Sequence, residues 1–449
     1  MDHAHFAEIA PANRRMPAPP RFIFGAMPAD VAAEFFGRRA RLPPMGFYHA
    51  RNITLSDGLL MRAAGQLLGP LEINIEERHI RAALAKFGLP GQAPPSRLTG
   101  PHALIVGPGY HIYGHWLVEI LPKLGVLRAA GCDLDRLKLL VPHNIPGFAT
   151  HMLGLLGFTE EQLVVFGGPA GDVQVEELLL VSFPHNGVRY TGMLHDTVAL
   201  WRQRIETRHG ALSQGSYPRR IFLARRGTSR PLADRPAVEA SFADAGFNVV
   251  VPETLPLLEQ RRMFAGATAI AGEYGSALHG SLFSPPGTVV CALHGSAFHP
   301  AFVQSGIGEV LAQPTGYIFG INNDDAAYGF RVAPSDVKAC LDSIFRPDAA
   351  AVSVSPAASL ATAATTAADF VALHDRHVEA GQWGAARKAI RNALALEPDY
   401  PGTQSRRARL LARLNAPGAL AAINRAIEAG ETDAEIHALR SELLLRKEK

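Results

Sequence analysis

The stretch ATAIAGEYGSALHGSLFSPPGTVVCAL, residues 267–293, decides the fold class of this chain. A short apolar run, residues 268–271, leads into a glycine-bounded turn at residues 272–275. A helical pattern over residues 276–283 is stopped by two prolines, and a second apolar run follows at residues 288–293. The order strand, glycine turn, helix and strand predicts an α/β sheet, in which ligands bind at the carboxyl ends of the strands.

The start of the helix after this turn offers unpaired backbone N–H groups. Together with the helix dipole they favour an anion, most often a phosphate. We also consider Tyr274 as a residue that stacks on a base or sugar. The alternative is an ordinary turn whose glycines serve only steric needs. The candidate ligand-binding residues here are Gly272, Glu273, Tyr274, Gly275, Ser276 and His279.

Composition indicates a globular protein. The chain has 449 residues, 47% of them hydrophobic and 19% charged, with a net charge of +3. This length favours two or three domains, and the charge gives no reason to expect nucleic acid. Cys132, Cys291 and Cys340 lie far apart, so neither a zinc site nor a disulfide framework is expected. The first fifteen residues lack an apolar core, so we expect a cytoplasmic protein, with peripheral attachment to the inner membrane surface as an option.

Strand and helix patterns alternate from residue 101 onward. The first unit includes a strand at 103–106 and a helix at 114–130 with a proline in its interior. A long helix at 193–208 leads to a second unit, which starts with the strand at 221–224. We expect parallel, doubly wound sheets. Before this region, segments 51–55 and 58–61 predict a hairpin around Ser56-Asp57-Gly58, and 302–310 reads as irregular.

The domain boundaries follow from these patterns and from low-complexity segments. A Pro- and Ala-rich start predicts a flexible tail, and the Ala/Ser/Thr/Pro stretch before the last helices predicts a linker. The predicted division is a tail at 1–20, a first Rossmann-like domain at 21–208, a second Rossmann-like domain at 209–345, a linker at 346–366 and a helical domain at 367–449.

The helical end contains a repeat. Ala386, Ile390 and Ala393 recur about 33 residues later as Ala419, Ile423 and Ala426, which suits a helix-pair repeat of the tetratricopeptide (TPR) kind. So few repeats cannot bury a full solenoid core. We therefore expect them to dock on the α/β body, self-associate or bind a protein partner, or else to form a helical cap.

Charged residues mark two further candidate groups. Arg225 and Arg226 follow a predicted buried strand, with Arg230 nearby, and guanidinium groups suit diphosphate oxygens. His115 and Glu119 are four residues apart on a predicted helix, so they share a face and either is a candidate base. Glu259 is a candidate for bonding a ribose or base. Asp133-Leu134-Asp135 matches DxD but lies in a loop after a helix, so we expect a structural role.

Several segments, in this order, resemble family 61 glycosyltransferases: GHWLVEILPKL at 114–124, ARRGTSR at 224–230 and VPETLPLLEQRRMFAGATAIAGEYGSALHGSLFSPPGTVV at 251–290. The resemblance covers roughly residues 100–345. It implies an α/β fold with two Rossmann-like domains in the GT-B arrangement, here followed by a small α-helical domain. The domain at 21–208 would then be the acceptor-side domain, and the domain at 209–345 the nucleotide-sugar-binding domain. It also implies an inverting transfer without a DxD metal site, so no cofactor is expected beyond a nucleotide-sugar co-substrate, with a UDP-sugar as the first expectation.

Two functional hypotheses follow. The first is a glycosyltransferase that moves a hexosyl or pentosyl group from a nucleotide sugar to a hydroxyl of a glycan, polysaccharide precursor, lipid-linked or protein acceptor. The second is an inactive scaffold that acts through its helical domain, favoured because Tyr274 stands where the resembled family has His. Intact Arg225, Arg226 and HWLVE segments favour the first.

Overall fold

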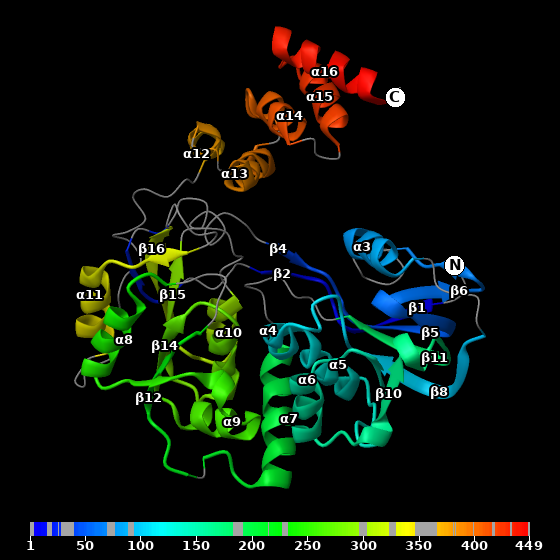
Figure 1. The fold of residues 1–449 in the computed structure, drawn as a ribbon, viewed down its shortest axis with the longest axis vertical. Coiled ribbons are helices and arrows are strands. Elements are labelled where there is room, and N and C mark those ends of the chain that lie inside the picture. Colours follow the sequence, from blue (N-terminus) through cyan, green and yellow to red (C-terminus); the bar gives the residue numbers. More distant parts are fainter. Residues whose placement is uncertain are drawn as a thin grey trace.

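A computed structural model of the chain describes residues 4–15, 20–25, 27, 40–69, 77–88, 94–182, 192–213, 215–226, 232–295, 303–322, 329–345, 366–379, 381, 383–397, 399–414, 418–431 and 433–447 (Figure 1). Within these ranges, two large sheets lie side by side with helices between them. Helices from the end of the chain form a separate group (Figure 1). The structure is therefore a mixed α/β body with a helical addition.

The first sheet is mixed, with the strand order β10-β9-β8-β11-β5-β6-β7 and β1 beside β5. Its strands β8 to β11 run parallel, as predicted, but β5, β6 and β7 are antiparallel to their neighbours. The predicted hairpin around Ser56-Asp57-Gly58 is confirmed, and its strands add an antiparallel part to the parallel strands that follow residue 95. The bounds are β1 Ala4–Ala10, β5 Met45–Ser56, β6 Leu60–Ala63, β7 Gln66–Leu67, β8 Ser96–Leu104, β9 Lys138–Pro142, β10 Leu163–Phe166 and β11 Val173–Ser182.

The helix predicted at 114–130 is continuous but changes its winding. It begins as α4, Tyr113–His115, widens into a π-helix at Trp116–Ile120 and continues as α5, Pro122–Ala129. Pro122 has no N–H to donate and its ring crowds the preceding turn, so a wider turn before it relieves the clash. The other helices of this half are α3 Glu77–Phe87, α6 Gly147–Leu155, α7 Gly192–His209 and short 3-10 turns at Asp57–Leu59, Glu160–Gln162 and Gly168–Ala170.

The N-terminal segment departs from the predicted loose tail. β1 pairs antiparallel with β5, and the rings of Phe6 and Tyr48 lie 4.9 Å apart. This pairing satisfies the backbone groups along one side of β5. Two further short strands, β2 Asn13–Arg15 and β4 Ala40–Leu42, pair with each other. The strand β3, Ile23–Phe24, pairs with the second sheet, so the predicted first domain at 21–208 includes a segment that belongs to the other half.

The second sheet has the strand order β13-β12-β14-β15-β16-β17, parallel from β13 to β16. The predicted irregular segment at 302–310 is a helix, because its apolar residues Val303 and Ile307 are one turn apart and buried. The bounds are β12 Arg220–Leu223, α8 Arg235–Asp244, β13 Asn248–Val250, a 3-10 turn η5 Pro252–Thr254, α9 Leu257–Gly266, β14 Ala269–Glu273, a 3-10 helix η6 Ser276–Phe283, β15 Val289–Gly295, α10 Val303–Val310, β16 Thr315–Asn322, β17 Phe330–Arg331 and α11 Pro334–Ile344.

One hydrophobic core runs across the two halves. It includes residues of the first sheet together with Phe264 of α9, Leu278 of η6 and Phe283. Trp201 of α7 stacks on Phe283 at 6.3 Å, and Arg202 donates to the Phe283 carbonyl at 2.7 Å. The facing ends of the two sheets are therefore held by continuous packing. Among the described residues, no helix is long and apolar enough to cross a membrane.

The last helices pack in chain order as successive antiparallel neighbours. Ala386, Ile390 and Ala393 are buried in one small core, and Ala419, Ile423 and Ala426 are buried in a second. The predicted repeat positions are thus core positions of alternate helices. The predicted linker, apart from Thr366, lies outside the described residues. The bounds are α12 Ala367–Glu379, α13 Trp383–Leu396, α14 Thr403–Arg413, α15 Ala419–Glu428 and α16 Ala434–Lys447.

Candidate functional site

The candidate site lies at the carboxyl ends of the central strands of the second sheet. Strand β12 is flanked by β13 on one side and by β14 on the other, so the strand order reverses at β12. In open parallel sheets such a reversal leaves a crevice beyond the strand ends, and ligands bind there. Arg225 follows β12, and the turn at residues 274–275 with Ser276 follows β14.

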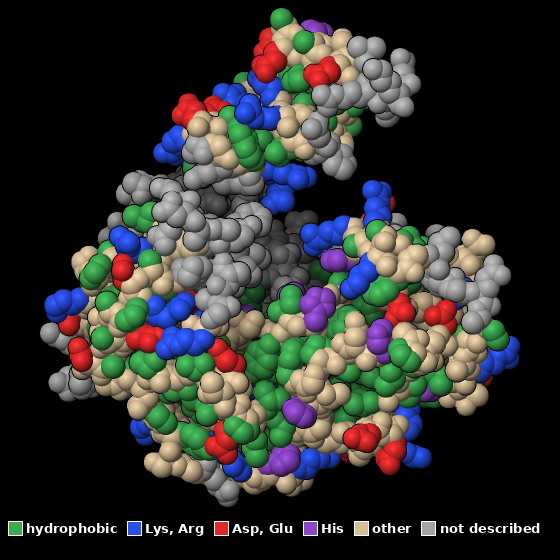
Figure 2. Space-filling model, in the orientation of Figure 1, with side chains coloured by type: hydrophobic (Ala, Val, Ile, Leu, Met, Phe, Trp, Pro, Cys, Tyr) green, Lys and Arg blue, Asp and Glu red, His purple; other side chains and the backbone are tan. Residues whose placement is uncertain are grey.

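A cleft of about 680 Å³ opens at this reversal, a volume suited to a small ligand such as a nucleotide. Both halves of the α/β body contribute to it, and the predicted residues Arg225, Arg226 and Ser276 come together there. On the face seen in Figure 2, hydrophobic side chains with scattered histidines gather over the middle of the body. The described lining residues are Tyr113, Gly147, Phe148 and His151 from the first half, and Arg225, Arg226, Pro252, Glu253, Leu255, Pro256, Leu257, Gln260, Ser276 and Ala277 from the second.

The side chain of Arg225 is held by a backbone carbonyl of the glycine turn. Its Nη1 donates to the carbonyl oxygen of Tyr274 at 3.1 Å. The approach is close: a Cβ added at Gly275 would lie 2.6 Å from that Nη1. A side chain at position 275 would therefore displace the guanidinium, so Gly275 lets Arg225 lie against the turn and remain part of the cleft wall.

Arg226 is held by a carboxylate outside the cleft. Its guanidinium makes two hydrogen bonds to Glu239 of α8, at 2.6 and 3.1 Å, and its side chain is 48% exposed. The hydrogen bonds that Arg226 donates to Glu239 raise the pKa of Arg226 above its ordinary value. The paired, partly exposed arginine keeps its positive charge at the cleft wall, where it can attract an anion.

Helix α4 of the first half touches η6 of the second half directly. A Cβ on Gly114 would lie 2.6 Å from the Ser276 Oγ and 3.1 Å from the His279 ring. One residue earlier, the Tyr113 hydroxyl donates to Gln260 Oε1 at 2.9 Å and accepts from Arg261 at 3.1 Å. These contacts place α4, which leads into the HWLVE sequence at 115–119, against the predicted phosphate-binding turn.

His115 and Glu119 form a pair on the helix that follows. The His115 Nδ1 lies 2.7 Å from a Glu119 carboxylate oxygen, and both side chains are partly exposed. Lys123, one turn further, has its pKa lowered to about 8 by burial, an effect that the charge of Glu119 opposes. Neither His115 nor Glu119 is among the described residues that line the cleft, although Gly114 next to them contacts Ser276.

Residues 113–291 match the family model Glycosyltransferase 61. The match supports a glycosyltransferase. It extends from the first residue of α4 to β15 and contains every described residue that lines the cleft. The cleft is thus a feature of the glycosyltransferase 61 region itself, and not of the flanking segments. No curated protein matches the chain.

Three predicted donor-binding residues of this region are buried instead of facing the cleft. Glu273 is 1% exposed and makes two hydrogen bonds to Arg235, at 2.8 and 3.3 Å. Tyr274 is 5% exposed, with its ring 4.8 Å from that of His294. His279 is 7% exposed, and its Nδ1 lies 3.3 Å from Gln304 Oε1. These side chains shape the turn from beneath, while the backbone carbonyl of Tyr274 holds Arg225.

The surroundings of Gly272 and Glu259 in the structure also differ from a donor-binding role. A Cβ on Gly272 would lie 2.7 Å from the Leu223 carbonyl oxygen, so this glycine permits close approach of β12 and β14. Glu259 accepts a hydrogen bond from Tyr217 and lies 3.6 Å from Arg262, outside the described cleft lining. The predicted Arg230 lies outside the described residues.

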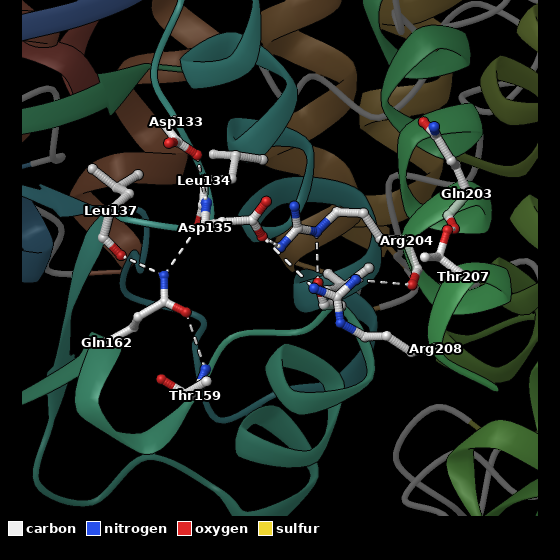
Figure 3. A network of polar contacts seen from close by, with 11 residues as sticks. Asp133, Leu134, Asp135, Leu137, Thr159, Gln162, Gln203, Arg204, Thr207 and Arg208 are labelled. Atoms are coloured by element: carbon white, nitrogen blue, oxygen red, sulfur yellow. Dashed lines mark hydrogen bonds and ion pairs between the residues drawn. The ribbon is translucent and has the colours of Figure 1, made fainter.

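The DxD sequence at 133–135 is part of a polar network (Figure 3), and none of its three residues is among the described residues that line the cleft. Asp133 accepts from the backbone N–H of Asp135 at 3.0 Å, and Asp135 pairs with Arg204 of α7 at 2.7 Å. Arg204 also donates to the Leu156 carbonyl at 2.6 Å. The loop therefore joins α5 to α7, as its position after a helix suggested. No group of three metal-ligating side chains occurs in the part of the chain that the structure describes.

Several cleft residues were missed from the sequence, among them Phe148, His151 and Glu253. Phe148 and His151 lie on α6, and Glu253 follows β13. Phe148 and His151 are three residues apart on a helix, which puts them on one face, but only the fold brings that face to the cleft. Glu253 had a readable signal, since it directly follows the second strand of a predicted α/β unit.

Proposed function

We propose that the chain is an inverting, metal-independent glycosyltransferase of GT-B arrangement that uses a nucleotide-diphosphate sugar. The observation that carries this is the cleft at the strand reversal, where Arg225, Arg226 and Ser276 meet the start of α4. Guanidinium groups and helix-start N–H groups are suited to a diphosphate, and in this setting they stabilise its negative charge as it departs.

The proposed reaction is a single displacement at the sugar's anomeric carbon. The acceptor hydroxyl oxygen forms the new bond, the bond to the diphosphate oxygen breaks, and the hydroxyl proton passes to a base. We assign the base role to His115 with Glu119 as its partner. If Nδ1–H donates to Glu119 across the 2.7 Å contact, Nε2 is left as the proton acceptor.

The donor and acceptor classes follow the sequence expectations. We propose a UDP-sugar as donor and a glycan, lipid-linked or protein hydroxyl as acceptor, in the cytoplasm or at the inner membrane surface. The Glu273, Tyr274 and His279 side chains would support the turn and not touch the donor. Gly272 would serve packing, and Gly275 and Ser276 would offer backbone donors.

The test is thermal unfolding with UDP, GDP, CMP and ADP, each with and without EDTA. A ligand that binds only the folded state raises the unfolding midpoint. The proposal predicts a rise with one nucleotide that EDTA does not change and that Arg226→Ala reduces. Absence of a rise with every nucleotide would contradict it.

A scaffold role is the second candidate, favoured by a groove of about 800 Å³ among α12, α13, α14 and α16. Its floor holds Trp383 with Arg413 stacked over the ring at 4.3 Å, and Arg406 paired with Asp375. Such a groove suits a protein segment, or a second copy of the chain. If this role is the main one, Trp383→Ala removes partner binding, and no nucleotide sugar is hydrolysed or transferred by the wild type.

A further inference from the structure

We propose that Glu253 is the ribose-binding carboxylate of the cleft, so that the donor is a ribonucleotide sugar and not a 2′-deoxyribonucleotide sugar. This inference rests on the proposed function and names the substrate class of that same site. It concerns the end of the cleft formed by η5, away from the turn that follows β14.

The first argument is the position of Glu253 in the sheet. Strands β12 and β13 are paired neighbours, with Leu223 opposite Val250, and the Ala224 N–H donates to the Val250 carbonyl at 2.8 Å. Their ends are therefore level. Arg225 lies two residues after Leu223, and Glu253 lies three residues after Val250. Neighbouring strands are about 4.8 Å apart, a step comparable to that from a phosphate to the adjoining ribose.

The same order serves nucleotides in other doubly wound sheets. There the phosphates lie at the turn after the first strand, and an acidic residue near the end of the second strand bonds the ribose 2′-hydroxyl. Here β12 is the first strand, with Arg225 and Arg226 at its end, and β13 is the second, with Glu253 after it. The topology assigns phosphate and ribose to the two adjacent positions.

The second argument is that the neighbouring carboxylates are paired with arginines, whereas Glu253 is exposed in the cleft. Glu239 is paired with Arg226, and Glu273 is buried against Arg235. Glu253 is exposed and is the acidic side chain among the described residues that line the cleft. No hydrogen bond or ion pair to its carboxylate occurs within the described ranges, and its charge adds to the raised pKa of Arg226.

Chemistry limits what such a carboxylate can bind. It only accepts hydrogen bonds, and it repels the phosphates that the arginines attract. The parts of a nucleotide that can donate beside a diphosphate are the sugar hydroxyls, and a carboxylate with two oxygens can accept from the 2′- and 3′-hydroxyls together. A ribose diol therefore satisfies Glu253 without bringing a phosphate closer.

The experiment compares matched nucleotide pairs by isothermal titration: UDP with dUDP, GDP with dGDP, CDP with dCDP and ADP with dADP. For the pair that binds, the wild type is expected to prefer the ribonucleotide by roughly 10-fold or more, the value of one hydrogen bond to a charged group. Glu253→Gln should bring this preference near to unity. The ratio between two ligands cancels the general effect of removing a negative charge, as in a double-mutant cycle.

Two control variants keep the result interpretable. Asp244→Asn removes a negative charge from the same half, at the exposed end of α8 outside the described cleft lining, and should leave the preference unchanged. Arg226→Ala should weaken both members of the pair equally. A wild type that binds a nucleotide without any preference, or a preference that survives in Glu253→Gln, overturns this inference and leaves the proposed function standing. No binding by any pair overturns the proposed function and this inference with it.

Discussion

Two groups of arginines lie beside carboxylates in this molecule, and they differ in what surrounds them. At residues 133–135, Asp135 pairs with Arg204, whose side chain is only 12% exposed and also bonds the Leu156 carbonyl (Figure 3). At the end of β12, Arg225 donates to the Tyr274 carbonyl, Arg226 donates to Glu239, and both arginines line an open cleft. Both groups match ligand-binding sequence patterns. Position relative to the sheet separates them, because only the second lies at the carboxyl ends of parallel strands.

The largest effect should come from Arg225→Ala. We expect nucleotide affinity to fall roughly 10- to 100-fold, because a charge-assisted contact to the diphosphate is lost. The free energy of unfolding should change by no more than about 1 kcal/mol, the value of the hydrogen bond to Tyr274. Titration calorimetry and urea unfolding measure the two quantities. An unchanged affinity would remove the distinction between the two arginine groups.

Gly114→Ala should have the next largest effect. The new Cβ would lie 2.6 Å from the Ser276 Oγ and 3.0 Å from its Cβ, so α4 and η6 must separate. We expect a loss of about 1–3 kcal/mol in unfolding free energy, together with weaker nucleotide binding. The matched control is Gly154→Ala in α6, where a Cβ meets nothing within 4 Å and should stabilise the helix slightly. Equal stability of the two variants would argue against close contact between the halves.

Asp135→Asn tests the structural arginine group. The variant should lose about 1 kcal/mol of unfolding free energy, since the pair with Arg204 is partly exposed. Nucleotide affinity should stay within experimental error of the wild type, with or without added divalent metal. A metal-dependent affinity that disappears in Asp135→Asn would instead make the DxD sequence a working metal site.

Lys123→Met is expected to change stability in a way that depends on pH. The pKa of Lys123 is lowered to about 8 from 10.5, so between these values the unfolded chain binds more protons than the folded one. The free energy of unfolding of the wild type therefore increases as the pH rises across that window. This lowering of the pKa corresponds to about 3 kcal/mol, so the variant should gain up to about that much relative to the wild type below about pH 8, and the gain should shrink above it. Urea unfolding of both proteins across this window measures the difference, and a constant difference would contradict the burial of a charged amine.

Much of the fold could be predicted because local signals agreed with tertiary structure. The segment at 267–293 forms the strand, turn, helix and strand that its pattern indicated. The hairpin at 51–61 was readable from Ser56-Asp57-Gly58. Pairings between distant segments were not readable: β1 with β5, and β3 with β16, depend on long-range contacts that no local pattern encodes.

The candidate site was predictable in its backbone and less so in its side chains. Arg225, Arg226 and Ser276 could be placed because strand ends and helix starts are local features. The burial of Tyr274 and His279 could not, because it depends on β15 and α10 packing over the turn. The position of the cleft residue Phe148 likewise depends on tertiary packing, because its ring lies 5.6 Å from that of Tyr113 on another helix of the same half.

The most direct test of the central claim is a crystal structure of the full chain with the nucleoside diphosphate that binds best. The account predicts density for the diphosphate at the end of β12 and β14, within hydrogen-bond reach of Arg225 and the backbone N–H of Ser276. A diphosphate bound elsewhere, or at the loop of residues 133–135, would contradict the account.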